Sequence, residues 1–227
     1  MRPRTAAIVL APLLALLAGA SAAEEFQDAR RGIAFDVPAG WREIPDATLG
    51  ELSAVAAKKA GIRTPQYVAG FARGAGPGLA YPYVLVQDHP IRHAGLDQLA
   101  KAFTGLDRVE AVEKISRSDL VQKTRLGTPV LDPDRKAVMI PLTFEIKEVG
   151  KVQGLTALFP LRDSVLQLNF YAVEPQYERD LADFAVMLDS VHEIGSGAPP
   201  GRLRMGSVFL LVAVLVMLAA TALLAWR

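Results

Sequence analysis

The sequence predicts an α+β domain in which helices pack on the faces of an antiparallel sheet of about six strands, followed by one C-terminal transmembrane helix. The strongest observation is that residues 137–146 alternate between apolar and other side chains, which is typical of a strand with one buried face. Short turns lead on to apolar runs at 152–159 and 165–173, and short connections force neighbouring strands to be antiparallel. Residues 177–188 then carry an apolar stripe at helical spacing, which requires a sheet face to cover it.

The first half of the chain adds shorter strands. Alternating apolar residues, or residues that suit a pleated surface, predict strands at 32–37, 41–44, 66–72 and 83–87. The turn Pro38-Ala39-Gly40 joins the first two, so residues 41–44 are expected to return alongside residues 32–37. The stretch 74–78 is predicted to be a loop, because three glycines and a proline within five residues exclude regular structure.

Helices are predicted between these strands. Thr48 and Glu51 match a capping box that would open a first helix, and Gly61 would close it. An apolar stripe at 96–103 predicts a second helix, and beyond a glycine break residues 106–115 suggest a further helical piece.

Prolines shape the second half. The turn signal Pro133-Asp134 predicts that residues 129–132 pair back on the long strand that follows. Pro141 lies inside that strand and has no backbone N–H, so a bulge or an edge position is expected there. Pro175 suits the first turn of the last helix, which is expected to end near residue 190.

The N-terminus has the three parts of a secretory signal. Two arginines supply the positive start, residues 6–17 form a short apolar core, and Ala20-Ser21-Ala22 offers the small residues that a signal peptidase recognises. Cleavage is predicted after Ala22 or Ala23, so residues 1–23 are assigned to a signal peptide; an uncleaved N-terminal anchor is the alternative. No cysteine stands at this site, so a lipoprotein is excluded.

The C-terminus predicts the membrane anchor. Residues 205–226 contain no charged side chain and would span roughly 33 Å as a helix, enough to cross a hydrocarbon core of about 30 Å. We therefore assign 205–227 to a transmembrane anchor and 195–204 to a linker rich in glycine and proline. With a cleaved signal, the domain at 24–194 would lie on the extracytoplasmic side.

Two other interpretations of this end remain open. Arg202 and Arg204 lie on the predicted outer side, against the positive-inside rule, so a tail-anchored cytoplasmic protein is one alternative. Small residues at 195–198, a spacer and an apolar tail also match a GPI-attachment signal, whose tail is removed. Asn169 is the single asparagine and begins no glycosylation sequon, which weighs against a eukaryotic surface protein.

Composition excludes several classes of protein. The formal net charge of +1 argues against a nucleic-acid partner, which normally requires a basic face. The chain has no cysteine, which excludes thiol nucleophiles, thiolate metal sites and disulfides. Without its two apolar ends the chain keeps about 175 residues, which is enough for one domain with a sizeable core.

Three stretches have the order and pattern of a known family. They are GIAFDVPAGW at 32–41, GLTALFPLRDSVLQLNFYA at 154–172 and FAVMLDSVHE at 184–193. In these stretches the chain resembles the PsbP-like/DcrB-like family of exported α/β/α sandwich domains. The resemblance implies that fold and an accessory or binding role without known chemistry. PsbP is a photosystem subunit that helps retain calcium and chloride, but no ion-binding residue is carried over to this chain. The C-terminal membrane helix departs from the family pattern.

Histidines are the best candidates for a metal site. His89 and His93 lie four residues apart and Asp88 adds a carboxylate, but a proline between them interrupts a helix and the ligand set is short. A polar connection between a strand and a helix is the favoured interpretation. His192 and Glu193 follow the last helix, where a histidine usually serves the helix dipole and solvent.

Other polar residues also have simple structural interpretations. Asp132 and Asp134 offer two carboxylates to calcium, but they lack further ligands and fit a β-turn better. No Gly-x-Ser-x-Gly motif is present, and three serines lie in polar or turn-like contexts: Ser116, Ser118 and Ser164. The stretch 74–78 is not followed by Lys-Ser/Thr and is no phosphate loop.

Four aromatic residues leave two interpretations open. They are Trp41, Tyr67, Tyr81 and Tyr83. They either line a ligand or partner surface beside the loop 74–78, or they belong to the core and its rim.

No catalytic, cofactor-binding or metal-binding residue is therefore predicted. We interpret the chain as a membrane-tethered, non-enzymatic accessory or binding domain of a bacterial envelope system. Its predicted partners are the lipid bilayer and a membrane or envelope protein. The alternatives are a metal-assisted enzyme around His89 and His93, and a carrier of a small apolar ligand.

Overall fold

The computed structural model describes residues 23–60, 64–74, 80–91, 95–104 and 121–195. The strands of this part are β1 Glu24–Asp28, β2 Ile33–Val37, β3 Trp41–Glu43, β4 Tyr67–Arg73, β5 Tyr83–His89, β6 Val121–Leu126, β7 Val130–Asp132, β8 Ala137–Ile146, β9 Gly150–Pro160, β10 Val165–Val173 and β11 His192–Glu193. Its helices are α1 Asp46–Ala60, α2 Leu96–Thr104 and α4 Glu174–Ser190.

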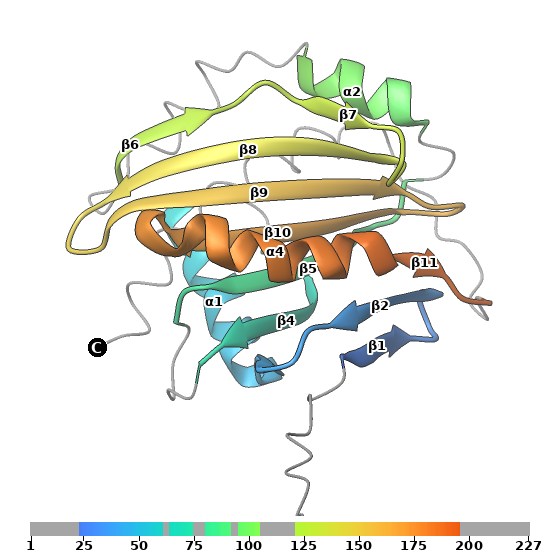
Figure 1. Ribbon diagram of the computed structural model, residues 1–227, viewed down its shortest axis with the longest axis horizontal. Helices are drawn as coiled ribbons and strands as arrows, with labels where there is room; N and C mark the ends of the chain where they lie inside the picture. The colour runs from blue at the N-terminus through green and yellow to red at the C-terminus, as the bar shows by residue number, and fades with distance from the viewer. Residues whose placement is uncertain (1–22, 61–63, 75–79, 92–94, 105–120, 196–227) are drawn as a thin grey trace, which may run out of the picture.

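The chain is an α+β protein built on a large antiparallel sheet. Seven strands pair in the order β3-β4-β5-β10-β9-β8-β6, and β7 adds to β8, so this sheet has eight strands rather than about six. A second sheet of three strands, β1-β2-β11, lies beside α4 (Figure 1). The hairpins β8–β9 and β9–β10 form the middle of the large sheet in continuous register.

Two hydrophobic cores lie on opposite faces of the large sheet, as the prediction of helices on its faces requires. One core contains side chains of α1 and α2, and the other contains side chains of α4 and β2. Figure 1 shows α4 in front of the sheet and α1 behind it. Because both faces are covered, every residue of β10 from Val165 to Ala172 is buried.

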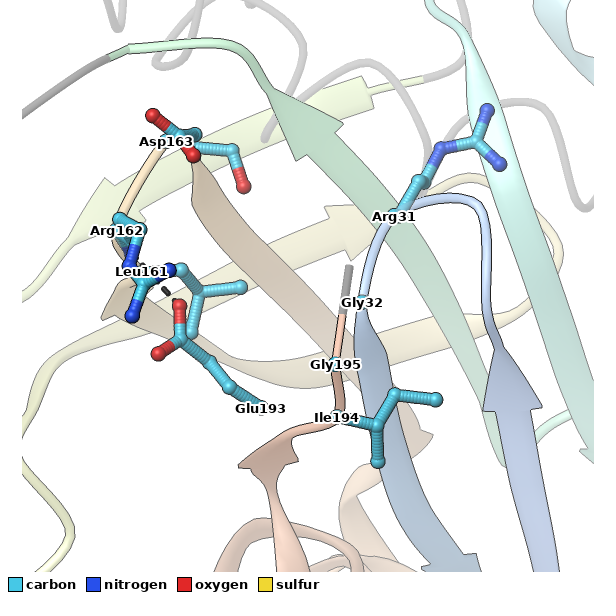
Figure 2. Close-up of a pocket in the computed structure, with 9 residues that line it drawn as sticks. Arg31, Gly32, Leu161, Arg162, Asp163, Glu193, Ile194 and Gly195 are labelled. Atoms are coloured by element: carbon cyan, nitrogen blue, oxygen red, sulfur yellow. Dashed lines mark hydrogen bonds between the residues drawn. The ribbon is translucent and has the colours of Figure 1, made fainter. Parts of the chain in front are cut away.

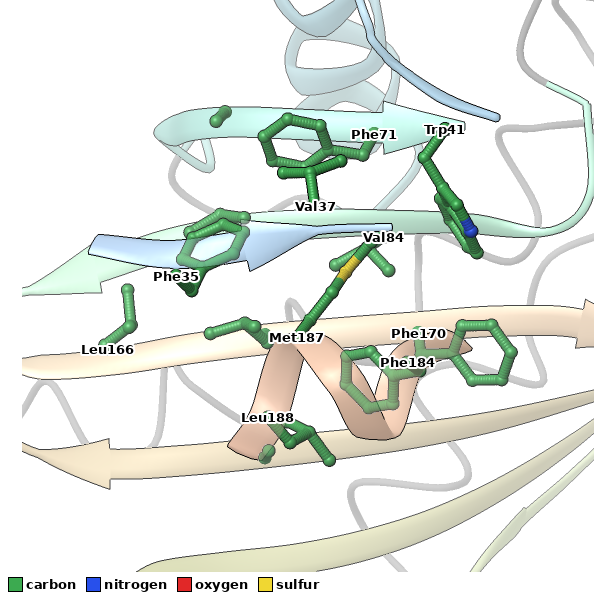
Figure 3. Close-up of a cluster of buried hydrophobic side chains, with 14 of the residues drawn as sticks. Phe35, Val37, Trp41, Phe71, Val84, Leu166, Phe170, Phe184, Met187 and Leu188 are labelled. Carbon is green, nitrogen blue, oxygen red and sulfur yellow. The ribbon is translucent and has the colours of Figure 1, made fainter. Parts of the chain in front are cut away.

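The second core is held together by α4. Phe184 of α4 stacks on Phe170 of β10, with ring centroids 5.0 Å apart and planes inclined by 13°. Met187 and Leu188 extend the same helical stripe over the sheet (Figure 3). The predicted stripe on the last helix is thus confirmed in part: Tyr177, Phe184 and Leu188 are buried, Leu181 and Ala185 are only partly buried, and Met187 is fully buried as well.

The strands predicted with the clearest alternation are confirmed. Residues 137–146 and 165–173 form β8 and β10 with the predicted bounds, and β7 pairs back on β8. Pro141 causes no bulge against β9. It lies where the other neighbour of β8 changes from β6 to β7, and its carbonyl accepts a hydrogen bond from Gly127 N on that side (2.8 Å). Its missing N–H therefore faces a local edge, as expected.

Some pairing predictions are wrong. Residues 41–44 do not return alongside 32–37: β3 pairs with β4 in the large sheet, whereas β2 pairs with β1 and β11. Turn residues predict that a chain reverses, but they do not predict which sheet receives it. Three strands, β1, β6 and β11, were not predicted. β6 contains a register shift between Val121 and Lys123 that disrupts its alternation, and β11 has only two residues.

The predicted capping box is also wrong. α1 begins at Asp46, so Thr48 lies inside its first turn, and Leu49 N already donates to Pro45 O at 3.1 Å. The predicted helix end at Gly61 and the helical piece 106–115 lie outside the described residues.

The predicted ends are not part of the described structure. Residues 1–22 and 196–227 hold nearly all of the signal peptide, most of the linker and the whole apolar anchor. Among the helices that are described, none is long and apolar enough to cross a membrane.

Candidate functional site

A cluster of polar side chains lies inside the domain, on the face of the large sheet that α1 and α2 cover. We call Gln87, His89, Thr156, Gln167 and Asn169 the interior polar cluster. Strand alternation places them there: β5, β9 and β10 lie side by side, and these residues share the face that carries Leu85, Leu158 and Tyr171.

Asn169 is the centre of the interior polar cluster and is fully buried. Its side-chain oxygen accepts hydrogen bonds from Thr156 Oγ1 (2.8 Å) and Gln167 Nε2 (2.7 Å). Its amide nitrogen donates to Gln87 Oε1 (3.3 Å) and Leu85 O (3.4 Å). Gln167 Oε1 in turn lies 2.9 Å from His89 Nε2. The four hydrogen bonds match the donors and acceptors of one amide, so the arrangement ties three strands together.

Within the part of the chain that the structure describes, His89 belongs to the interior polar cluster and not to a metal site. Its Nε2 is engaged by Gln167, and His93 lies outside the described residues. Among the residues that are described, no group of three or more histidine, aspartate or glutamate side chains is arranged to hold a metal ion. Burial lowers the pKa of His89, although the Gln167 hydrogen bond and the Asp88 charge oppose this.

This histidine predicts a pH-dependent stability. Because the pKa of His89 is lower in the folded chain, the unfolded chain binds its proton more readily, and the free energy of unfolding falls as pH drops through about 6.5. One such group contributes a slope of at most about 1.4 kcal/mol per pH unit. Urea unfolding between pH 7.5 and 5.5 should show this fall in the free energy of unfolding. In His89→Gln the free energy of unfolding should depend less on pH. Val186→Ala is the control and should keep the slope, because it leaves His89 in place and removes no titratable group. An unchanged slope in His89→Gln would contradict this assignment.

The candidate aromatic residues do not form one surface. Tyr81 lies 5.1 Å from Tyr83, and Tyr83 lies 5.2 Å from Tyr171, measured between ring centroids. These rings and Tyr67 belong to the core beneath α1 and α2, whereas Trp41 belongs to the opposite core. Burial raises the pKa of Tyr67 and Tyr83 well above the usual value. The tyrosines are thus core residues, and the hypothesis of a shared surface with Trp41 is wrong.

The remaining sequence candidates have structural partners or lie elsewhere. Asp132 accepts hydrogen bonds from Arg135 N (3.0 Å) and Arg135 Nη1 (2.8 Å), which is the expected turn, and these bonds lower its pKa. His192 Nδ1 lies 2.8 Å from Ser190 O, and Glu193 accepts from Arg162 N at 2.7 Å. Ser164 is nearly buried in the turn between β9 and β10. Ser116, Ser118, and residues 75–78 of the predicted loop lie outside the described residues.

A small hollow lies where the described chain ends. It has a volume of about 250 Å³ and is lined by residues of three segments: 31–32, 161–164 and 193–195 (Figure 2). Its two arginines are balanced by Asp163 and Glu193, and Figure 2 shows the Arg31 side chain turned away from Arg162. The hollow therefore offers no concentrated charge of either sign.

A larger groove lies between the two sheets, and we call it the β1–β3 groove. Its volume is about 550 Å³, within the range typical of ligand sites. It is lined by Glu24, Glu25, Phe26, Gln27, Val37, Trp41, Arg42, Glu43 and Phe71. Three carboxylates and one guanidinium make its lining acidic, while aromatic and aliphatic side chains form its apolar part. Glu24 and Glu43 have no ion-pair partner within the described ranges.

The wall of the groove is firmly anchored. Trp41 Nε1 donates to Asp183 Oδ2 of α4 at 3.0 Å. Arg73 Nη1 lies 2.6 Å from the same oxygen and 3.3 Å from Asp180 Oδ1. Asp180 is fully buried in α4, at a position that the apolar stripe does not predict. These contacts hold β3 and β4 against α4, so the groove has a fixed wall.

Sequence reasoning missed this groove. No strand was predicted at residues 24–28, because Phe26 is the single apolar residue there and cannot show alternation. Trp41 was a candidate from the sequence, but four of the nine residues that line the groove come from β1, a strand that was not predicted.

The similarity of this chain to known proteins is a similarity of fold. No family model matches it, and no curated protein sequence does. It is similar to the solution structure of cyanobacterial PsbP (CyanoP) from Synechocystis sp. PCC 6803, with a TM-score of 0.47 and 13% identity over 79% of this chain and 98% of that one. It is also similar to LpqN of Mycobacterium tuberculosis, described as involved in cell envelope biogenesis, with a TM-score of 0.38 and 12% identity over 76% of this chain and 86% of that one.

A protein from Bacteroides thetaiotaomicron is a further structural neighbour. Its TM-score is 0.48 at 8% identity, and the match covers 82% of this chain but only 56% of that one. The resemblance to PsbP-like domains that the sequence predicted thus recurs among the structural neighbours, at low sequence identity. At these values the likeness assigns no role to any residue of this chain.

Proposed function

We propose that the chain is a non-catalytic, extracytoplasmic binding domain that is held at a membrane by its C-terminal segment and receives a partner in the β1–β3 groove. The observation that carries the proposal is the groove itself, about 550 Å³ in volume, acidic, partly apolar and built on an anchored wall. The candidate reactive residues support a binding role. Among those described, His89 is bonded to Gln167 and Asp132 to Arg135, so they are engaged in structure and do not converge.

The location is proposed from the two ends of the sequence. A signal peptide at 1–23 and an apolar span at 205–226 would leave the domain outside the cytoplasm, joined to the membrane by a short linker. The nine linker residues that follow Gly195, at 196–204, would reach at most about 30 Å when extended. The domain would therefore work close to the membrane surface.

The absence of cysteine makes the location simple to test. Asp134→Cys places a single thiol on an exposed turn. A maleimide that does not cross membranes should label it in cells with an intact cytoplasmic membrane. Labelling that appears only after lysis would overturn the proposed location.

The binding role is tested by crosslinking in native membranes. A photoreactive phenylalanine analogue in place of Arg42 lies in the β1–β3 groove, and the same analogue in place of Lys136 lies on an exposed turn far along the chain. We expect a discrete crosslinked product from position 42 that is absent from position 136. No product from position 42, with the protein folded and in the membrane, would overturn the proposed site.

A further inference from the structure

We propose that the β1–β3 groove binds an extended, lysine- or arginine-rich segment of another protein, which adds as a strand to the open edge of β1. The inference rests on the proposed function, because it names the kind of partner that the same groove receives. Within the described residues β1 pairs only with β2, and β3 pairs only with β4, so each strand has an open side.

The groove runs along strand edges. Residues 24–27 are four consecutive residues of β1, and all of them line the groove. Successive side chains of a strand point to opposite faces, so a pocket on one face would touch only alternate residues. Three consecutive residues of β3, at 41–43, line it as well. The groove therefore lies beside the backbone of both strands, where a further strand would pair.

Hydrogen bonds of β2 show which backbone groups of β1 are open. Asp36 N donates to Ser190 Oγ at 2.7 Å, so the backbone groups of Asp36 point away from β1. Ala34 pairs with His192 on that same side. The residues opposite them on β1 are Glu25 and Gln27. In an antiparallel ladder such a pair turns its backbone groups outward on both strands, so Glu25 and Gln27 present theirs to the open edge.

β3 shows the same alternation. Ile44 N donates to Gly70 O at 2.7 Å, which places the backbone groups of Ile44 and Arg42 toward β4. Glu43 lies between them in the chain, so its N–H and C=O point to the open side. An extended segment in the groove would thus find unpaired donors and acceptors on both walls, which is the requirement for binding by strand addition.

The charged side chains that line the groove favour a basic partner. Glu24, Glu25 and Glu43 line the groove together with one cation, Arg42, and Glu25 Oε1 also lies 3.7 Å from His192 Nε2. A second copy of the chain is disfavoured, because antiparallel pairing of β1 with itself would place Glu24 opposite Asp28 across the edge, and like charges in opposed positions are destabilising. Lysine or arginine side chains would instead complement the carboxylates and increase the association rate.

The apolar part of the groove adds a second preference. Phe26 packs on Phe35 and Phe71, with ring centroids 4.9 and 5.5 Å away, and remains partly exposed. An added strand would turn every second side chain toward this apolar part and the others toward solvent. The expected segment therefore alternates basic and apolar residues over about five or six positions, which matches the length of β1.

Defined peptides test this directly on the full chain in detergent micelles. The probe is an acetylated and amidated eight-residue peptide of alternating lysine and valine, with binding followed by fluorescence anisotropy. One comparison peptide has glutamate in place of lysine. Another carries methyl groups on the backbone nitrogens of alternate residues, which removes the N–H donors that strand pairing needs. We expect both changes to weaken binding at least tenfold. We also expect bound probe to slow hydrogen exchange at residues 24–28, measured by mass spectrometry.

Two variants separate the backbone from the side chain. Gln27→Pro removes the outward N–H of β1 without removing a hydrogen bond to β2, and Gln27→Ala removes the same side chain but keeps the N–H. Binding should be at least tenfold weaker in Gln27→Pro than in Gln27→Ala, with equal melting temperatures. Should Gln27→Pro not fold, the N-methylated peptide still tests strand pairing on the unchanged protein, through the complementary hydrogen bonds that the peptide N–H groups donate to carbonyls of β1.

The outcomes distinguish this inference from the proposed function. Equal binding of the lysine and glutamate peptides, or no effect of N-methylation, would overturn strand addition by a basic segment. If the peptides fail while the crosslinker at position 42 still captures a discrete product, the groove binds a partner of other chemistry and only this inference fails. If both experiments fail, the proposed function fails as well.

Discussion

Replacing Asn169 with leucine should lower the free energy of unfolding by about 4 kcal/mol, because it leaves several buried polar groups without partners. Asn169 is fully buried and bonds to Thr156, Gln167 and Gln87 as well as to a backbone carbonyl. Leucine has a similar volume but no hydrogen-bonding group. Each buried group that loses its partner costs about 1–3 kcal/mol, and a domain of this kind has only about 5–15 kcal/mol in total.

Thr156→Val is the matched comparison. Valine keeps the shape of threonine and removes one donor, so Asn169 Oδ1 still accepts from Gln167. We expect a loss of about 1 kcal/mol. Guanidinium unfolding of the purified chain, followed by circular dichroism, measures both. If Asn169→Leu proved as stable as the original protein, the interior polar cluster would not be a structural network, and the hydrogen bonds assigned to Asn169 would be wrong.

Phe184→Ala should cost about 3–5 kcal/mol of unfolding free energy. Phe184 is fully buried and stacks on Phe170 of the central strand β10. Alanine leaves a cavity between α4 and the sheet, and the surrounding backbone of β9 and β10 is too well paired to close it. The loss should also weaken binding at the β1–β3 groove, because α4 holds Trp41 through Asp183.

Val186→Ala is the control on the same helix. Val186 is 42% exposed, so its truncation should change stability by less than about 0.5 kcal/mol. Thermal unfolding of the two variants side by side distinguishes them. Equal melting temperatures would show that α4 does not hold the second core together, contrary to the packing in Figure 3.

Much of the sheet was predictable because its strands are neighbours in sequence. β8, β9 and β10 have clear periodicity and short turns, and hairpin pairing follows from chain connectivity alone. The apolar stripe of α4 likewise predicted a helix that packs on the sheet. The failures are β1, β6 and β11, whose short or irregular patterns carry little local signal.

The candidate site depended on contacts between distant segments. Phe26 lies on β1, which pairs with β2, and its ring packs on Phe71 of β4, 45 positions later in the chain. Asp183 is another example: its Oδ2 accepts a hydrogen bond at 2.6 Å from Arg73 Nη1, more than a hundred positions earlier in the chain. No periodicity within α4 encodes that partner.

The sequence by itself determined the class of fold, the order of the central hairpins and the apolar ends on which the proposed membrane location depends. These properties are local, since they follow from spacing within short stretches of chain. Only the tertiary structure decided that β2 leaves the large sheet, that the tyrosines are interior, and that the open edges of β1 and β3 border one acidic groove. Those outcomes depend on which apolar faces pack against each other. Such contacts join segments that are far apart in the chain, so no short stretch of sequence encodes them.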